Sequence, residues 1–324
     1  MTKPHFEELL DLIKSLSKSE KRYFKIFSLR YATKGGNKHV RLFDIIDRLP
    51  LYDENKILKK TSCTKKQLNS QKSHLYELIL RSLAIYNLEG DAEKKINKIV
   101  SHAKILFEKG LFAQCEKILL KAKHLAYQYE KYESLIEILS WERRVLVINP
   151  QGDTIQQKKD AIQHEKKTTL KKIQNTDDYI HLADNIYSFI RTKGILRSEN
   201  ELQEFKNLIN HVLLKKESQA LTKEARRSLY SIYALFYQQV GDLAKSYDYF
   251  KKIAEMVGSS PEQIKEHPHI YLFSLNNLGL ISHQLARYDE LALVIEKIRT
   301  IPEKLKNKCK ESIKVKIFEQ SYHL

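Results

Sequence analysis

The sequence predicts an all-α protein in which a small N-terminal helical module is followed by a solenoid of helical hairpins. The 324 residues include only 9 Gly and 6 Pro, fewer than turn-rich β folds use. Apolar residues recur at intervals of three and four, which is the spacing of one helix face. Small residues recur every 42 to 47 positions between such segments, which is typical of repeated helical pairs. We expect a module over 1–90, about five hairpins over 91–302 and a capping helix over 303–324.

The module of residues 1–90 begins with three predicted short helices. The first starts at Phe6. The second follows a Ser-x-x-Glu capping box at Ser17 and Glu20, and it ends before the pair Gly35-Gly36. The third ends near Pro50, because proline disfavours a helical conformation of the residue before it.

A helix–turn–helix is predicted at the end of this module. Asp53 caps a short helix, residues 61–64 form a turn, and a long helix then runs to about residue 88, with Gly90 as its C-terminal cap. A basic second helix after such a turn is the outline of a DNA-binding element. The turn lacks glycine, however, and the second helix is longer than a usual recognition helix. The candidate nucleic-acid contacts are the lysines around the turn: Lys56, Lys59, Lys60, Lys65, Lys66 and Lys72.

The net charge leaves two interpretations open. The chain carries 57 Lys and Arg against 40 Asp and Glu, a net charge of +17, and residues 1–175 hold +14 of it. A basic half of this kind favours contact with a nucleic acid, a ribosome or an acidic partner. The alternative is a solvated lysine surface that keeps the protein soluble.

Small residues mark the predicted turns of the solenoid. We expect each of them to lie between two helices, because a small residue would allow the helices to pack closely. Successive spacings are 42, 42, 47 and 45 residues. The residues are Gly110, Gly152, Gly194, Gly241 and Ala286.

The last two units resemble the tetratricopeptide repeat, whose pattern is W-x-x-L-G-x-x-Y, then a small residue, then A-x-x-x-F. The final unit matches at Leu275, Leu278-Gly279, Ser282 and Ala286. The unit before it matches at Tyr230, Tyr233-Ala234, Tyr237, Gly241, Ser246 and Phe250. The resemblance implies a right-handed, TPR-like solenoid in which the first helix of each hairpin lines a concave groove.

The whole chain is also similar to a group of bacterial proteins with tetratricopeptide-like repeats. The segments that carry this similarity are residues 16–25 and 75–83. It implies a scaffold and supplies no catalytic residue. A C-terminal helix from Glu303 to Tyr322 would cover the apolar end of the last repeat, as terminal repeats require. Its apolar residues are Leu305, Cys309, Ile313 and Ile317.

The groove implied by the resemblance is the predicted binding site for a peptide or protein. Residues beside the packing positions of the first helices point into the groove of a tetratricopeptide array. Asn and Gln suit such a groove because each offers a donor and an acceptor to an extended peptide backbone. A solvated polar face would carry the same residue types, so both interpretations stay open. The candidate ligand contacts are Arg191, Gln238, Gln239, Asn276 and His283.

Catalysis, cofactors and metals have no sign in the sequence. The glycine-rich, G-x-S-x-G and H-E-x-x-H patterns are missing, and the pair His267 and His269 has no third ligand at a suitable spacing. Three isolated cysteines fit a reducing compartment. There is no run of 18 apolar residues and no secretory signal. We therefore predict a cytoplasmic, non-enzymatic protein with no cofactor, no metal and no membrane partner. Its oligomeric state is not indicated.

Overall fold

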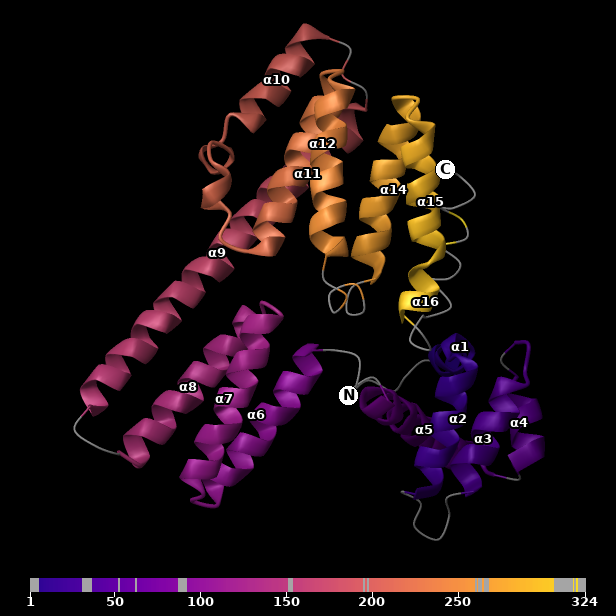
Figure 1. The fold of residues 1–324 in the computed structure, drawn as a ribbon. Helices are drawn as coiled ribbons and strands as arrows, with labels where there is room; N and C mark the ends of the chain where they lie inside the picture. The colour runs from indigo at the N-terminus through magenta and orange to yellow at the C-terminus, as the bar shows by residue number, and fades with distance from the viewer. Residues whose placement is uncertain are drawn as a thin grey trace. The chain divides into compact units, whose positions relative to one another are not determined.

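The fold is all-α, as predicted. A computed structural model describes residues 6–30, 37–51, 53–61, 63–86, 92–150, 154–194, 196, 198–259, 261, 264, 268–305, 317 and 319. Every regular element in these residues is a helix. The chain divides into two compact units, Met1–Gly90 and Asp91–Leu324. Figure 1 shows the helices of both.

Five helices make up the described part of the first unit. They pack around one apolar core that includes Ile13, Phe24, Ile46, Leu75 and Ile79, each with no exposed surface. Helix α5 packs along α2, and α3 contacts α1, α2, α4 and α5. The helices are α1 (Phe6–Ser15), α2 (Lys18–Arg30), α3 (Asn37–Asp47), α4 (Glu54–Thr61) and α5 (Lys65–Tyr86).

Side-chain caps fix where two of these helices start. The Ser17 N–H donates to Glu20 Oε2 at 2.8 Å, and the Glu20 N–H donates to Ser17 Oγ at 3.3 Å. This reciprocal pair is the capping box predicted for α2. Asp53 accepts the N–H of Lys56 at 3.0 Å, which confirms the predicted cap of α4. Gly35, Gly36 and Gly90 lie outside the described residues.

The second unit contains a series of packed helices with one long exception. Five of the helices have 17 residues, whereas α9 has 39. The helices are α6 (Ala92–Glu108), α7 (Phe112–Gln128), α8 (Tyr132–Ile148), α9 (Ile155–Lys193), α10 (Glu199–Ile209), α11 (Lys223–Gln239), α12 (Leu243–Gly258), α14 (Pro268–Gln284), α15 (Tyr288–Arg299) and α16 (Ile301–Leu305). Two short 3-10 turns, η2 (Val212–Leu214) and η3 (Glu217–Gln219), precede α11.

Four hairpin turns share one backbone conformation. Gly110, Glu130, Gly241 and Ala286 have φ angles of 72°, 51°, 81° and 53°. In the turns at Gly110, Glu130 and Ala286, the N–H of the next residue also donates to the carbonyl five positions back, as from Leu111 to Leu106 at 2.9 Å, which is the Schellman pattern of helix ends. Three of these turns were predicted, and at two of them, Gly110 and Gly241, the predicted reason was wrong. A Cβ at Gly110 or Gly241 would meet nothing within 4 Å, so glycine relieves backbone strain there and does not make room for a neighbour.

A repeated contact joins the two helices of two hairpins. The Cys115 thiol donates to the carbonyl of Ala103 at 3.2 Å, and the Ser246 hydroxyl donates to the carbonyl of Ala234 at 2.9 Å. In each pair the alanine lies seven positions before the turn glycine and the donor lies five positions after it, so the two residues are 12 positions apart. All four residues are fully buried. The α6–α7 and α11–α12 hairpins are therefore built alike.

The array is less regular than the predicted spacing implies. A regular series would place two helices between Gly152 and Gly194, but α9 runs continuously over Ile155–Lys193. This stretch contains no Gly or Pro that would break it. Gly152 itself lies outside the described residues, and Gly194 ends α9 with a φ of 72°.

Helix α9 takes part in both apolar cores of the second unit. Ile162 and Ile173 pack against the core of α6, α7 and α8. Tyr179 and Ile186, further along, are buried in the core of the later helices. Ile317 is also buried in this second core, at 6% exposed. Cys309 and Ile313 of the predicted terminal helix lie outside the described residues, as does the side chain of Leu305.

Candidate functional site

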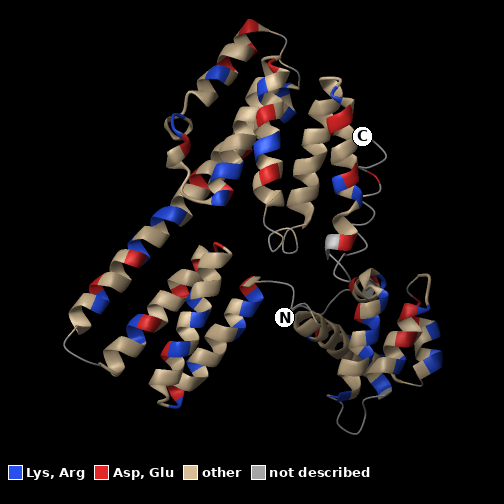
Figure 2. Ribbon diagram, in the orientation of Figure 1, with Lys and Arg blue, Asp and Glu red and all other residues tan. Residues whose placement is uncertain are grey.

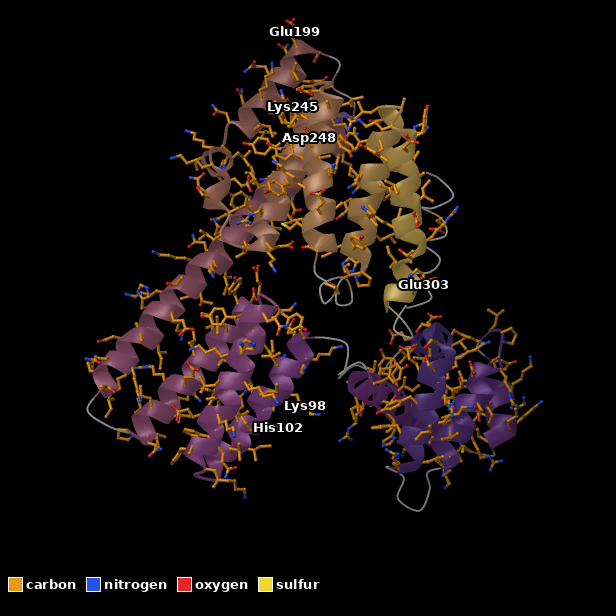
Figure 3. The ribbon with its side chains drawn as sticks, in the orientation of Figure 1. Lys98, His102, Glu199, Lys245, Asp248 and Glu303 are labelled. Carbon is orange, nitrogen blue, oxygen red and sulfur yellow. The ribbon has the colours of Figure 1, made fainter. Side chains whose placement is uncertain are left out.

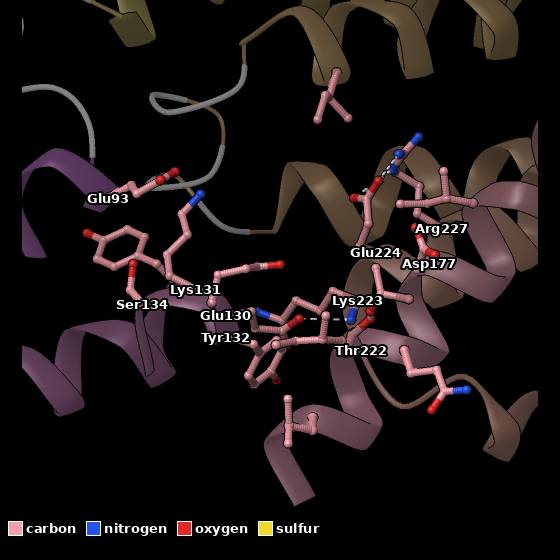
Figure 4. Close-up of a pocket in the computed structure, with 18 of the residues that line it drawn as sticks. Glu93, Glu130, Lys131, Tyr132, Ser134, Asp177, Thr222, Lys223, Glu224 and Arg227 are labelled. Carbon is pink, nitrogen blue, oxygen red and sulfur yellow. Dashed lines mark hydrogen bonds and ion pairs between the residues drawn. The ribbon is translucent and has the colours of Figure 1, made fainter. Parts of the chain in front are cut away.

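A cleft of about 850 Å³ opens in the second unit, beside the middle of α9 (Figure 4). We call it the α9 cleft. Its volume lies in the range of about 300–1,000 Å³ that is usual for ligand sites. The lining residues are Glu93 of α6; residues 129–134 at the α7–α8 turn; Leu170, Ile173, Gln174, Thr176, Asp177 and Ile180 of α9; Thr222, Lys223, Glu224 and Arg227 at the start of α11; Met256 and Val257 of α12; and Ile270 of α14.

One hydrogen bond joins two walls of the cleft. Glu130 Oε2 accepts the backbone N–H of Lys223 at 2.9 Å, although the two residues are 93 positions apart (Figure 4). The N–H groups of a helix's first turn have no partner within the helix, and the helix dipole favours a negative charge there. Glu130 thus caps α11 from the α7–α8 turn, while its own backbone has a positive φ.

A second set of bonds fixes the start of α11 against α9. The side-chain amide of Asn175 donates to the carbonyl of Gln219 at 3.0 Å and accepts the N–H of Leu221 at 2.9 Å. The hydroxyls of Thr176 and Thr222 lie 2.7 Å apart. Two consecutive side chains of α9 therefore hold the segment that leads into α11.

A charged network fixes α9 against α7 and α8. Lys123 Nζ lies 2.9 Å from Glu142 Oε2 and 2.8 Å from Glu165 Oε2, so one ammonium joins three helices. The Tyr127 hydroxyl donates to Glu165. Burial raises the pKa of Glu142 above its usual value. All these side chains are engaged within the protein, so we assign them a role in positioning α9.

The cleft combines apolar contacts with polar groups of both charge signs. Leu170 is 49% exposed, so it presents apolar surface to the cleft. Glu224 and Arg227 form an ion pair, with Arg227 Nε 3.1 Å from Glu224 Oε2. Burial, together with the nearby Glu130, raises the pKa of Tyr132 to about 12, so its hydroxyl stays neutral. No His or Cys is among the described lining residues.

None of the five predicted groove residues lines the α9 cleft. Arg191 is exposed in the last turn of α9, and His283 is exposed near the end of α14, edge-on to Tyr288. Gln238 and Asn276 are half-buried. Gln239 Oε1 accepts the N–H of Leu196 at 3.4 Å. Arg191, His283 and the two glutamines lie in the last turns of their helices, whereas the cleft lies at the first turns of α11 and α14.

The predicted lysines around α4 and α5 do not share one environment. Lys56 is exposed, and its Nζ lies 3.2 Å from Asp53 Oδ2. Lys72 is only 4% exposed, because it follows Leu68 and precedes Leu75 on the buried face of α5. Figure 2 shows where Lys and Arg lie along the helices. The remaining lysines of the predicted set are exposed and have no ion pair with a described residue. They are Lys59, Lys60, Lys65 and Lys66.

Comparisons with protein-family models, with curated proteins and with solved structures find no match to this chain. None of the helices in the described ranges is both long and apolar enough to span a membrane. Among the same residues, no three His, Cys, Asp or Glu side chains are arranged so that they would hold a metal ion. The candidate site therefore rests on the geometry of the α9 cleft.

Proposed function

We propose that the second unit is a TPR-like, non-enzymatic scaffold that binds an extended segment of a peptide or protein in the α9 cleft. The cleft carries the proposal: it is about 850 Å³ in volume, and its described walls come from six helices and the α7–α8 turn. Exposed apolar surface at Leu170 lies beside hydrogen-bonding groups such as Gln174. An extended peptide offers both kinds of contact, with its side chains and with its backbone.

The repeated hairpin contact supports the TPR-like part of the proposal. The tetratricopeptide pattern places a Gly in its first helix and an Ala in its second. Ala103 and Cys115 occupy such positions in one hairpin, and Ala234 and Ser246 in another. In the α14–α15 hairpin the corresponding residues are Gly279 and Leu291, both buried.

A peptide-display selection tests the proposal. Random 12-residue peptides would be selected on the full chain and on Leu170→Asn, which removes apolar surface from the cleft without adding charge. The matched control is Leu293→Asn, because Leu293 is 57% exposed on α15 and does not line the cleft. We expect peptides that the wild type and the control retain and that Leu170→Asn loses. A selection with no such peptides would refute the proposal.

A second candidate function is nucleic-acid binding by the first unit. Ion pairs offset several of its other cations, as between Lys21 and Asp47 and between Lys25 and Asp44, each at 2.6 Å. The four exposed lysines around the α4–α5 connection have no such ion pair with a residue that the structure describes. Two of them lie in the last turn of α4 and two in the first turn of α5, an arrangement compatible with phosphate contacts.

A further inference from the structure

The α9 cleft has the opposite charge to the chain that forms it. Among the residues that the structure describes, five carboxylates and three cations line it, a net charge of −2, whereas the whole protein carries +17. Charges of one sign within a cleft are focused by the surrounding low-dielectric walls and attract ligands of the other sign.

Two of the carboxylates remain available to a ligand. Glu130 caps α11 through Lys223, and Glu224 pairs with Arg227. Glu133 in the first turn of α8 and Asp177 in α9 are exposed, and neither has a hydrogen bond or ion pair with a described residue. The pairing of Arg227 also neutralises one of the three cations.

The apolar and acidic parts of the α9 wall have a defined spacing. Leu170, Ile173 and Asp177 follow one another at helix spacing, so they share one face of α9. Seven residues separate Leu170 from Asp177, which is about 10 Å along a helix at 1.5 Å per residue. Side chains two to four residues apart in an extended peptide cover a comparable length, at about 3.3 Å per residue.

We infer that the α9 cleft selects a positively charged peptide segment, with Lys or Arg side chains against Glu133 and Asp177 and an apolar side chain against Leu170. This inference rests on the proposed function, since it specifies the peptide that the cleft accepts. An acidic peptide would place like charges together at the cleft, which disfavours its binding.

The charge of the selected peptides tests the inference. The selection would be made on the full chain at physiological salt. Residue frequencies would be counted only in peptides that bind the wild type and do not bind the Leu170→Asn variant. The chain's charge of +17 favours nonspecific capture of acidic peptides, so enrichment of basic peptides cannot result from bulk attraction. We expect enrichment of Lys and Arg two to four positions from an apolar residue.

A matched pair of double variants provides the second readout. The double variant Glu133→Gln with Asp177→Asn should weaken the binding of the best basic peptide by about threefold to tenfold, as expected for the loss of two exposed ion pairs. Glu199→Gln with Asp248→Asn makes the same charge change at exposed residues of α10 and α12 outside the cleft (Figure 3), and it should leave binding within twofold.

Each outcome has a distinct meaning. Cleft-dependent peptides that are neutral or acidic would overturn this inference and leave the proposed function intact. Equal weakening by both double variants would also overturn it, because the effect would then be one of overall charge. Absence of any peptide that depends on Leu170 would overturn the proposed function and this inference together.

Discussion

Glu130 in the α7–α8 turn caps the N-terminus of α11 by accepting the N–H of Lys223 at 2.9 Å. The same residue holds a φ of 51°, a conformation that costs a non-glycine residue free energy. Glycine occupies this position in the α6–α7 and α11–α12 turns. We interpret the glutamate as retained for its carboxylate, which joins two walls of the cleft.

Glu130→Ala should lower the free energy of unfolding by about 1 kcal/mol, because it removes the cap and keeps the strained backbone. Glu130→Gly removes the same cap but relieves the strain, so it should be less destabilising than alanine by up to about 1 kcal/mol. Urea unfolding followed by the fluorescence of the single tryptophan, Trp141 of α8, measures both variants. A glycine variant less stable than the alanine variant would contradict this interpretation.

Gly241 separates two explanations of why small residues mark the hairpin turns. Its φ is 81° and a Cβ there would meet nothing within 4 Å. Gly241→Ala and Gly241→Leu should therefore cost nearly the same, about 1 kcal/mol each, and Gly241→Asn should cost less. Thermal unfolding followed by circular dichroism provides the comparison. A cost that rises with side-chain size would favour close packing instead.

Because of Lys72, the free energy of unfolding of the first unit should rise as the pH increases above about 8. Burial lowers its pKa from 10.5 to about 8, with Glu54 opposing the shift. Between these values the unfolded chain binds more protons than the folded chain, so stability rises with pH from about 8 upward. We expect full-length protein to gain stability from pH 7.5 to 9.5 relative to Lys72→Met. Both proteins would be measured by urea unfolding, and equal pH dependence of the two would contradict the prediction.

The salt dependence of binding tests the second candidate function. With Lys56 beside Asp53 and Lys72 buried, four lysines remain for phosphate contacts. Binding of the full chain to duplex DNA should then follow a log–log salt slope of about −3.6, from about −0.9 per contact. Replacing Lys59, Lys60, Lys65 and Lys66 by Gln should flatten that slope. Fluorescence anisotropy measures it, and absence of binding at physiological salt would remove this candidate.

Local signals in the sequence predict much of the fold. Ser17 and Glu20 identify the start of α2 because the cap involves only neighbouring residues. Gly110 and Gly241 identify turns because their backbone conformation favours glycine. Lys72 is buried and not a surface contact, and its helix spacing from Leu68 and Leu75 is the sequence signal for this.

The cleft was not predictable in the same way. Its walls come from elements far apart in sequence, and the Glu130–Lys223 bond leaves no local pattern. The predicted groove residues depend on a regular series of hairpins. The continuous helix α9 breaks that regularity. Positions counted from a regular repeat therefore do not coincide with the residues that line the cleft. The unbroken stretch between Ile155 and Lys193, without Gly or Pro, was the available signal.

The most direct test of the peptide-binding scaffold is the affinity of one selected peptide for three proteins. Isothermal titration would compare the wild type, Leu170→Asn and Leu293→Asn, after circular dichroism shows equal helix content. Removing apolar contact at Leu170 should raise the Kd about tenfold, which corresponds to about 1.4 kcal/mol, whereas Leu293→Asn should change it less than twofold. Equal Kd values for the two variants would contradict binding in the α9 cleft.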